Sequence, residues 1–162
     1  MSNYLSKNFL TNLITIIIIF LLDRISKFYV IYLSEKNLSY NLFQSKFLNI
    51  SLIWNEGIAF GLFSFDQKFY YNLLTILIIL ITLIVFWMIF KSEKLERLGF
   101  MMIFGGSLGN IFDRLFYSAV PDFIDFHIKN FHWFIFNVAD IFITLGVVIL
   151  IYCEVFLKKN YE

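Results

Sequence analysis

The chain has 162 residues, of which 60% are hydrophobic and 15% charged, and its formal net charge is +1. Ordinary soluble domains are roughly half apolar or less, so this composition, with a mean hydropathy of +0.77, predicts an integral membrane protein. The sequence has no basic block or arginine-rich arm, which argues against a nucleic-acid partner. Its single cysteine, Cys153, allows neither an internal disulfide nor a cysteine-based metal cluster.

The first apolar segment of spanning length covers residues 9–28, around the core LITIIIIFLL. A membrane-spanning helix needs roughly 17 to 25 predominantly apolar residues. Lys7 precedes this segment as in a cleaved signal peptide, but DRISK follows where small residues would mark a cleavage site. We therefore expect a retained helix.

Three more apolar segments follow, at residues 70–90, 98–117 and 133–157. The loop at 34–68 is not lipid-like, and its stretch NISLIWN alternates as a strand does. The expected fold is one mainly α-helical membrane domain over residues 1–162. It has four transmembrane helices, a small extracytoplasmic β-sheet in the first outer loop, and a short second outer loop.

Basic residues concentrate in three short pieces: the N-terminus, the loop KSEKLER at 91–97, and the C-terminus. The lysines on the other side are spread over longer loops. Because lysine and arginine are retained on the cytoplasmic side, both termini are expected in the cytoplasm. The chain is thus expected to be a multi-pass membrane protein.

This topology brings polar residues of three helices together near the outer face of the membrane. These residues are Asp23, Arg24, Lys27, Asn110, Asp113, Arg114, Asn137 and Asp140. Asp140 lies only about 10 Å below the expected start of its helix, at about 1.5 Å per residue. Carboxylates at such depths usually face the interior of a helix bundle and mark a pathway or a site.

Two structural explanations stay open for part of this set. Gly105 and Gly109 form a small-xxx-small pattern that lets a neighbouring helix approach closely, and they can serve packing alone. Asp113 can form plain ion pairs with Arg114, Arg24 or Lys27. Neither explanation accounts for Asp140, whose own helix offers little opposite charge.

The stretch VPDFIDFHI supplies a second acid, Asp122, on the same side as Asp140. Its alternation predicts a strand. When two carboxyl groups share a site, one holds a proton while the other is ionised, so one can activate water and the other can protonate a leaving amine. This is the chemistry of aspartic proteases. His127 and His132 could be general bases or ligands, but neither has a recognisable spacing of Cys, Ser or acid around it, and we interpret both as interfacial or surface residues.

Rival functions predict different features. A transporter would carry polar groups through the full membrane depth, whereas the inner halves of these helices are apolar. A helical scaffold would keep its function when Asp122 and Asp140 are replaced. A metal-dependent membrane transferase would need acids clustered on one helix, and the G-x-G-D signature of other membrane aspartic proteases is absent.

Five ordered motifs resemble those of the bacterial lipoprotein signal peptidases, or signal peptidase II: DRISK at 23–27, NEGIAFG at 55–61, GGSLGNIFDR at 105–114, VPDFIDF at 120–126 and FNVAD at 136–140. The resemblance implies cleavage of diacylglyceryl-modified prolipoproteins before the lipidated cysteine, without a cofactor or metal. It implies Asp122 and Asp140 as the catalytic pair. It also implies supporting or substrate-binding roles for Asp23, Lys27, Asn55, Gly57, Asn110, Asp113, Arg114, Asn137 and Ala139.

These positions suggest further roles. Asn137, one turn before Asp140, is expected to orient Asp140 or its partner. Asn55 could hold the substrate backbone, Gly57 and Gly61 could let the covering loop move, and Asn110 could bind substrate carbonyls or only pack. Prolipoprotein substrates and membrane lipid are the expected partners, and a monomer could supply every residue named.

Overall fold

The computed structural model describes residues 2–57, 67–129 and 131–157, with side chains described from residue 9 onward except that of Gln67. Gly61 and the basic C-terminal residues Lys158 and Lys159 lie outside the described residues. The elements in chain order are α1 (Ser2–Asn37), β1 (Asn41–Gln44), β2 (Leu48–Asn55), α2 (Gln67–Lys91), α3 (Lys94–Tyr117), β3 (Val120–Ile128), β4 (Phe131–Phe136), α4 (Val138–Tyr152) and the π-helical η2 (Cys153–Leu157).

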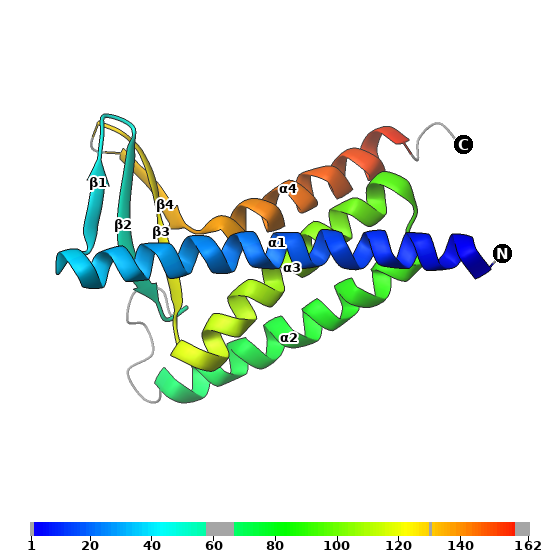
Figure 1. The fold of residues 1–162 in the computed structure, drawn as a ribbon, viewed down its shortest axis with the longest axis horizontal. Coiled ribbons are helices and arrows are strands. Elements are labelled where there is room, and N and C mark those ends of the chain that lie inside the picture. Colours follow the sequence, from blue (N-terminus) through cyan, green and yellow to red (C-terminus); the bar gives the residue numbers. More distant parts are fainter. Residues whose placement is uncertain (1, 58–66, 130, 158–162) are drawn as a thin grey trace.

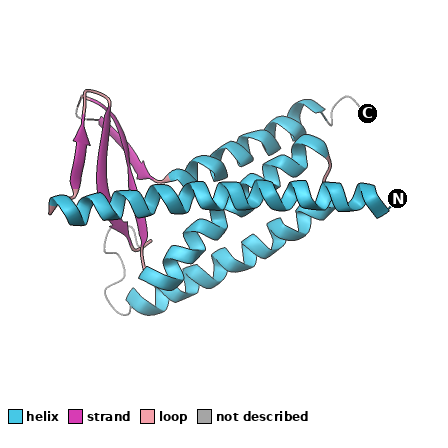
Figure 2. Cartoon of the chain, viewed as in Figure 1, coloured by secondary structure: helices cyan, strands magenta, loops and turns pink. Residues whose placement is uncertain are grey.

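The helices form a bundle, and the strands form a sheet at one end of it (Figure 2). Helix α3 contacts α1, α2 and α4 and is therefore the central helix. The start of α1, the turn between α2 and α3, and the end of α4 lie together at the end away from the sheet (Figure 1). The polar residues predicted to converge lie toward the sheet.

The outward faces of the helices are apolar. Leu73 and Ile84 on α2, and Val148 and Ile151 on α4, each expose more than half of their surface. Within the described residues, two helices are long and apolar enough to cross a membrane, Lys68–Lys91 and Val138–Leu157. The segments expected at 9–28 and 98–117 lie within α1 and α3, and their crossing of the membrane stays a prediction.

The predicted fourth span is wrong at its start. Residues 133–136 belong to strand β4, and α4 begins only at Val138. Asn137, the residue between them, has extended backbone angles (φ −125°, ψ −177°) and caps the helix. Aromatic and β-branched residues such as those of FHWFIF favour strands, so apolarity alone did not distinguish strand from span.

Two loops build the sheet, not the first outer loop alone as predicted. Strands β1 and β2 come from the first loop, β3 and β4 from the second, and all neighbours pair antiparallel in the order β1-β2-β3-β4. The alternation in VPDFIDFHI predicted β3 correctly. Val30 of α1, Leu52 of β2 and Phe123 of β3 form a buried cluster that attaches the sheet to α1.

Glycines of α3 let two helices approach it closely. A Cβ at Gly106 would lie 2.6 Å from the carbonyl oxygen of Ala139 on α4. A Cβ at Gly105 would lie 2.9 Å from Ile19 on α1. At Gly109 a Cβ would meet the Asp23 side chain of α1. Gly105 and Gly109 thus both face α1, as the close approach predicted for this pair requires.

Candidate active site

The start of α4 is a capping box that uses an acid of the site. The Asn137 side chain accepts a hydrogen bond from the Asp140 backbone N–H (3.2 Å), and Asp140 Oδ2 accepts one from the Asn137 backbone N–H (3.1 Å). Such reciprocal bonds satisfy donors that have no partner inside the helix. A carboxylate in the first turn is also favoured by the helix dipole. These two effects explain locally why an acid opens this apolar helix.

Asp122 meets the same asparagine from strand β3. Asn137 Nδ2 donates to Asp122 Oδ1 at 2.6 Å, and Asn55 Nδ2 donates to Asp122 Oδ2 at 2.8 Å. Asp122 is 4% exposed and Asn137 is fully buried. One residue, Asn137, therefore connects the carboxylate of the sheet with the carboxylate of the helix.

Asn110 on α3 completes the polar contacts of Asp140. Its Nδ2 donates to Asp140 Oδ1 at 2.9 Å, while its Oδ1 accepts from Lys27 Nζ at 2.8 Å. Because an ammonium group can only donate, Lys27 requires the amide oxygen on its side and leaves the NH₂ group toward Asp140. The arrangement fixes which way the Asn110 amide points.

The same logic orients the other two amides. Asn55 Oδ1 accepts from the Gly57 N–H at 2.7 Å, so its NH₂ group faces Asp122. Asn137 Oδ1 accepts from the Asp140 N–H, so its NH₂ group also faces Asp122. As a result, each of the four oxygens of Asp122 and Asp140 accepts one N–H bond. One lone pair per oxygen is left for a proton or a water molecule.

The pKa of Asp122 is raised to about 6, mainly by burial and also by the nearby charge of Asp140. The hydrogen bonds from Asn55 and Asn137 and the charge of Lys27 act in the opposite direction. Desolvation disfavours the ionised form of a carboxyl group, whereas N–H donors favour it. Asp122 is thus a carboxyl that can change protonation state near neutral pH.

A buried cluster of two acids and two bases lies beneath the pair. Arg24 donates to Asp113 Oδ1 at 2.6 Å and to Asp23 Oδ2 at 2.8 Å. Lys27 Nζ lies 2.9 Å from Asp23 Oδ1 and 2.7 Å from Asp113 Oδ2. Both acids are fully buried and Lys27 is 1% exposed. An unpaired charge in such a buried place costs several kcal/mol of stability, so removing any one of the four side chains would leave a destabilising buried charge.

This cluster positions the site through two contacts. Lys27 bonds Asn110, the amide that faces Asp140. Asp23 Oδ1 accepts from the backbone N–H of Ala139 at 3.0 Å, in the first turn of α4. The charges of α1 therefore fix both the amide beside Asp140 and the backbone that carries Asp140.

Arg114 lies apart from these charges. Its guanidinium carbon lies 5.5 Å from the centre of the Tyr71 ring. A Cβ added to Gly57 would lie only 2.8 Å from Arg114 Nη1, so a side chain at this position would collide with the guanidinium group. Gly57 has a φ of 72°, which glycine adopts without strain. Of the three cations considered as partners of Asp113, Arg24 and Lys27 form the ion pairs and Arg114 does not.

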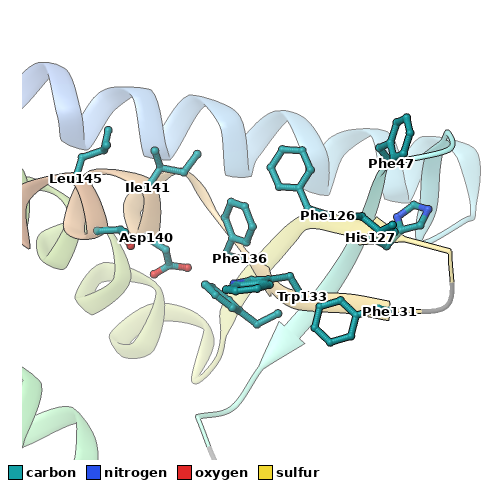
Figure 3. Close-up of a pocket in the computed structure, with 12 residues that line it drawn as sticks. Phe47, Phe126, His127, Phe131, Trp133, Phe136, Asp140, Ile141 and Leu145 are labelled. Atoms are coloured by element: carbon teal, nitrogen blue, oxygen red, sulfur yellow. The ribbon is translucent and has the colours of Figure 1, made fainter. Parts of the chain in front are cut away.

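An apolar pocket of about 640 Å³ opens beside Asp140. Figure 3 shows Asp140, Ile141 and Leu145 of α4 at one side of it and aromatic side chains of β3 and β4 at the other. Asp122 lines a second, separate cavity with Asn55 and Ile135. Ligand pockets are typically of this size and mostly apolar, with a few polar groups.

The structure brings all but one of the predicted site residues into one network of hydrogen bonds and ion pairs. The residues of this network are Asp23, Lys27, Asn55, Gly57, Asn110, Asp113, Asp122, Asn137, Ala139 and Asp140. Arg114 is the exception. Arg24 was not predicted as a supporting residue, although a cation next to Asp23 inside an apolar helix was a usable signal.

His132 is exposed and His127 is partly buried, and both lie beside an acid of the sheet. Within the described residues, Asp125, His127 and His132 form a group whose potential ligand atoms all lie within 4.8 Å of one another. Around Asp122 and Asp140, in contrast, the neighbours that reach the carboxylates are amide and backbone N–H donors, and no histidine bonds either acid within the described residues.

Comparison with known proteins gives concordant matches. The sequence profile described as "Signal peptidase (SPase) II" matches residues 15–156. A lipoprotein signal peptidase of Pelagibacter ubique (strain HTCC1062) is 51% identical over 154 residues, covering 95% of this chain and 93% of that protein. One of Francisella tularensis subsp. novicida (strain U112) is 46% identical over 120 residues, covering 72% and 74%.

Solved structures give the same result for the fold. A bacterial membrane enzyme determined by the in meso method at 2.3 Å resolution superposes with a TM-score of 0.74 at 26% identity, covering 94% of this chain and 92% of that one. A second, at 1.9 Å resolution, also has a TM-score of 0.74, at 28% identity, covering 90% and 93%.

Proposed function

Because the chain belongs to the signal peptidase II family, we propose that Asp122 and Asp140 form the catalytic pair of an aspartic-type lipoprotein signal peptidase. Family membership makes the protein a lipoprotein signal peptidase, a hydrolase of peptide bonds that acts on prolipoproteins. The observation that carries the catalytic assignment is the shared contact with Asn137, which bonds both carboxylates.

The reaction needs one ionised and one protonated carboxyl group. The ionised carboxylate accepts a proton from a water molecule, which attacks the carbonyl carbon of the scissile peptide bond. The protonated carboxyl donates to the carbonyl oxygen, and a proton then passes to the leaving amine. The raised pKa of Asp122 supports this sharing of one proton.

The apolar pocket supports a lipid-bearing substrate. Its lining is almost entirely aromatic and aliphatic, and Asp140 is the carboxylate at its edge (Figure 3). We assign to it the apolar end of a diacylglyceryl-modified prolipoprotein, with cleavage immediately before the lipidated cysteine. The Asn55 amide, fixed by Gly57 and bonded to Asp122, orients the acid, which differs from its expected role as a substrate clamp.

The proposed setting is a bacterial inner membrane crossed four times by one domain. Both termini lie in the cytoplasm and the sheet lies at the outer face, where a substrate descends from the outer leaflet. The side-by-side position of the α1 start, the α2–α3 turn and the α4 end supports this arrangement (Figure 1). A monomer suffices, since every residue of the proposed site belongs to one chain.

The activity is tested with purified protein in detergent and chelator. A diacylglyceryl-modified prolipoprotein is incubated with it, and the products are identified by mass spectrometry. We expect one cut, directly before the lipidated cysteine, and little cleavage of the same precursor without lipid. A cut elsewhere, or equal cleavage of both precursors, contradicts the proposed specificity.

A further inference from the structure

Asp125, His127 and His132 lie together on the sheet, outside the network of Asp122 and Asp140. Their potential ligand atoms are all within 4.8 Å of one another. Figure 3 shows His127 beside Phe47, at the side of the apolar pocket away from Asp140. The proposed peptidase reaction uses none of the three.

Strand geometry explains why they meet. Asp125 and His127 are two residues apart on β3, so they point to the same face of the sheet. The register pairs His127 of β3 with His132 of β4, and cross-strand partners share a face. An irregularity between Asp125 and His127 shifts the pairing by one residue, so that His132, and not Trp133, stands opposite His127.

Some polar atoms of this group have hydrogen-bond partners, and one does not. Asp125 is 5% exposed; it accepts from Asn49 Nδ2 at 3.2 Å and contacts His132 Nδ1 at 2.9 and 3.0 Å. The imidazole rings of His127 and His132 stack 5.0 Å apart at 20°. His127 Nδ1 is buried and, within the part of the chain that the structure describes, has no hydrogen-bond partner. Buried polar nitrogens are nearly always paired, and a bound ion or water molecule is one way to supply the missing partner.

A divalent cation would satisfy all three side chains. Zinc takes imidazole nitrogen and carboxylate oxygen at about 2.0–2.2 Å, so two ligand atoms of a tetrahedral site are about 3.3 Å apart. The Asp125–His132 separation of 2.9–3.0 Å is already close to this value. The side chain of His132 is 51% exposed and can rotate to close the remaining distance to His127. Asn49, bonded to the carboxylate, would orient it as outer partners of metal ligands do.

We propose that Asp125, His127 and His132 form a zinc site that clamps strand β3 to β4, with a water molecule as the fourth ligand. The clamp has a structural role: β3 carries Asp122, and β4 leads directly into Asn137 at the start of α4. The site goes beyond the proposed peptidase function, which needs no metal, so either assignment can fail without the other.

The test is a calorimetric titration of the full-length protein in detergent with Zn²⁺, after chelator has been used and removed. We expect one equivalent to bind to the wild type and the apparent melting temperature to rise. His132→Ala, His127→Ala and Asp125→Asn should each weaken binding at least about tenfold. His132 is half exposed, so His132→Ala is the variant least prone to misfold.

Two controls separate this site from other ligands. Asp122→Asn and Cys153→Ser should bind Zn²⁺ as the wild type does, because neither residue belongs to the group. Binding of Co²⁺ should give the visible absorption of a tetrahedral complex in the wild type and lose it in His132→Ala. No saturable Zn²⁺ binding, or binding that survives unchanged in all three ligand variants, would overturn the proposal.

Discussion

At the scale of single residues, Asn137 is the contact common to both proposed catalytic acids. We expect Asn137→Ala to lower kcat about 100-fold with a much smaller change in KM, since misplaced reacting groups lose about this much. Loss of the cap should also cost about 1 kcal/mol of stability. Steady-state kinetics and thermal melting in detergent measure the two effects.

Asn41→Ala is the matched control for this prediction. Asn41 is an exposed asparagine on β1, at the far edge of the sheet from β4. It should retain the kinetics and stability of the wild type. If Asn137→Ala keeps full kcat, the amide does not position the pair.

The raised pKa of Asp122 predicts a pH-dependent stability. The folded-state pKa of about 6 exceeds the ordinary value of 3.8, so the folded protein binds more protons between these values. The stability that protonated Asp122 contributes is complete below about pH 4 and is lost as pH rises through about 6. The loss is about 3 kcal/mol for a shift of about two pKa units. Asp122→Asn should therefore gain stability relative to the wild type between pH 4 and pH 8.

Unfolding of the two proteins in detergent, followed over this range, measures that difference. Other titrating residues contribute equally to the pH dependence of stability in both proteins, so their contributions cancel in the difference. A difference that is flat with pH would mean that Asp122 is not buried as a charged group in the folded protein.

Residue identities were predicted better than partners. The sequence placed Asp23, Lys27, Asn110 and Asp140 at one depth because helical rise and topology fix depth. It could not decide which cation bonds Asp113, because Arg114 is its neighbour in sequence but points to Tyr71 and Gly57. The neighbour to which a helical side chain points depends on how packing rotates the helix about its axis, and the local sequence does not determine this rotation.

At the scale of elements, the contact of α3 with α4 depends on glycine. A Cβ at Gly106 would lie 2.6 Å from the carbonyl oxygen of Ala139, whereas a Cβ at Gly99 would lie 3.0 Å from the Leu150 side chain and 3.1 Å from the carbonyl oxygen of Gly146, which requires smaller shifts. We expect Gly106→Ala to destabilise the protein by about 1–3 kcal/mol and Gly99→Ala by less. Thermal melting of the two variants, which place the same methyl group on the same helix interface, compares them directly.

Activity should follow the same order, because Ala139 adjoins Asp140 and its backbone N–H bonds Asp23. Equal stability of the two variants would show that the helices can separate without cost at Gly106.

The predicted elements differ in how well local pattern determined them. Strand β3 followed from alternation alone, because polar and apolar side chains face opposite sides of a half-buried strand. The start of α4 did not, because FHWFIF is apolar enough for either a strand or a span. The decisive signal was the capping box from Asn137 to Asp140, which marks a helix start three residues before the acid.

At the scale of the whole molecule, the sheet joins two loops that are far apart in the sequence. The pairing of β2 with β3 brings Asn55 beside Val120 and so places the Asn55 amide on Asp122. Such long-range pairing could not be read from either loop alone. The helices of the bundle were easier to predict, since each one corresponds to a long apolar segment of the sequence.

The proposed topology predicts which positions a membrane-impermeant thiol reagent reaches in intact cells. Tyr40→Cys, exposed beside the sheet, should be labelled, whereas Glu93→Cys, exposed in the α2–α3 turn, should be labelled only after the membrane is permeabilised. Cys153 is buried and provides the background. Labelling of Glu93→Cys without permeabilisation would reverse the orientation.

The central claim is that Asp122 and Asp140 act together, and the most direct measurement compares cleavage rates of a diacylglyceryl-modified prolipoprotein by Asp122→Asn, Asp140→Asn and the double variant. Glu56→Gln, an exposed carboxylate next to Asn55, is the control. With equal amounts of folded protein and chelator present, each single variant should lose nearly all activity, the double variant should lose hardly more, and Glu56→Gln should cleave normally. Cleavage at the wild-type rate by either folded single variant would contradict the account.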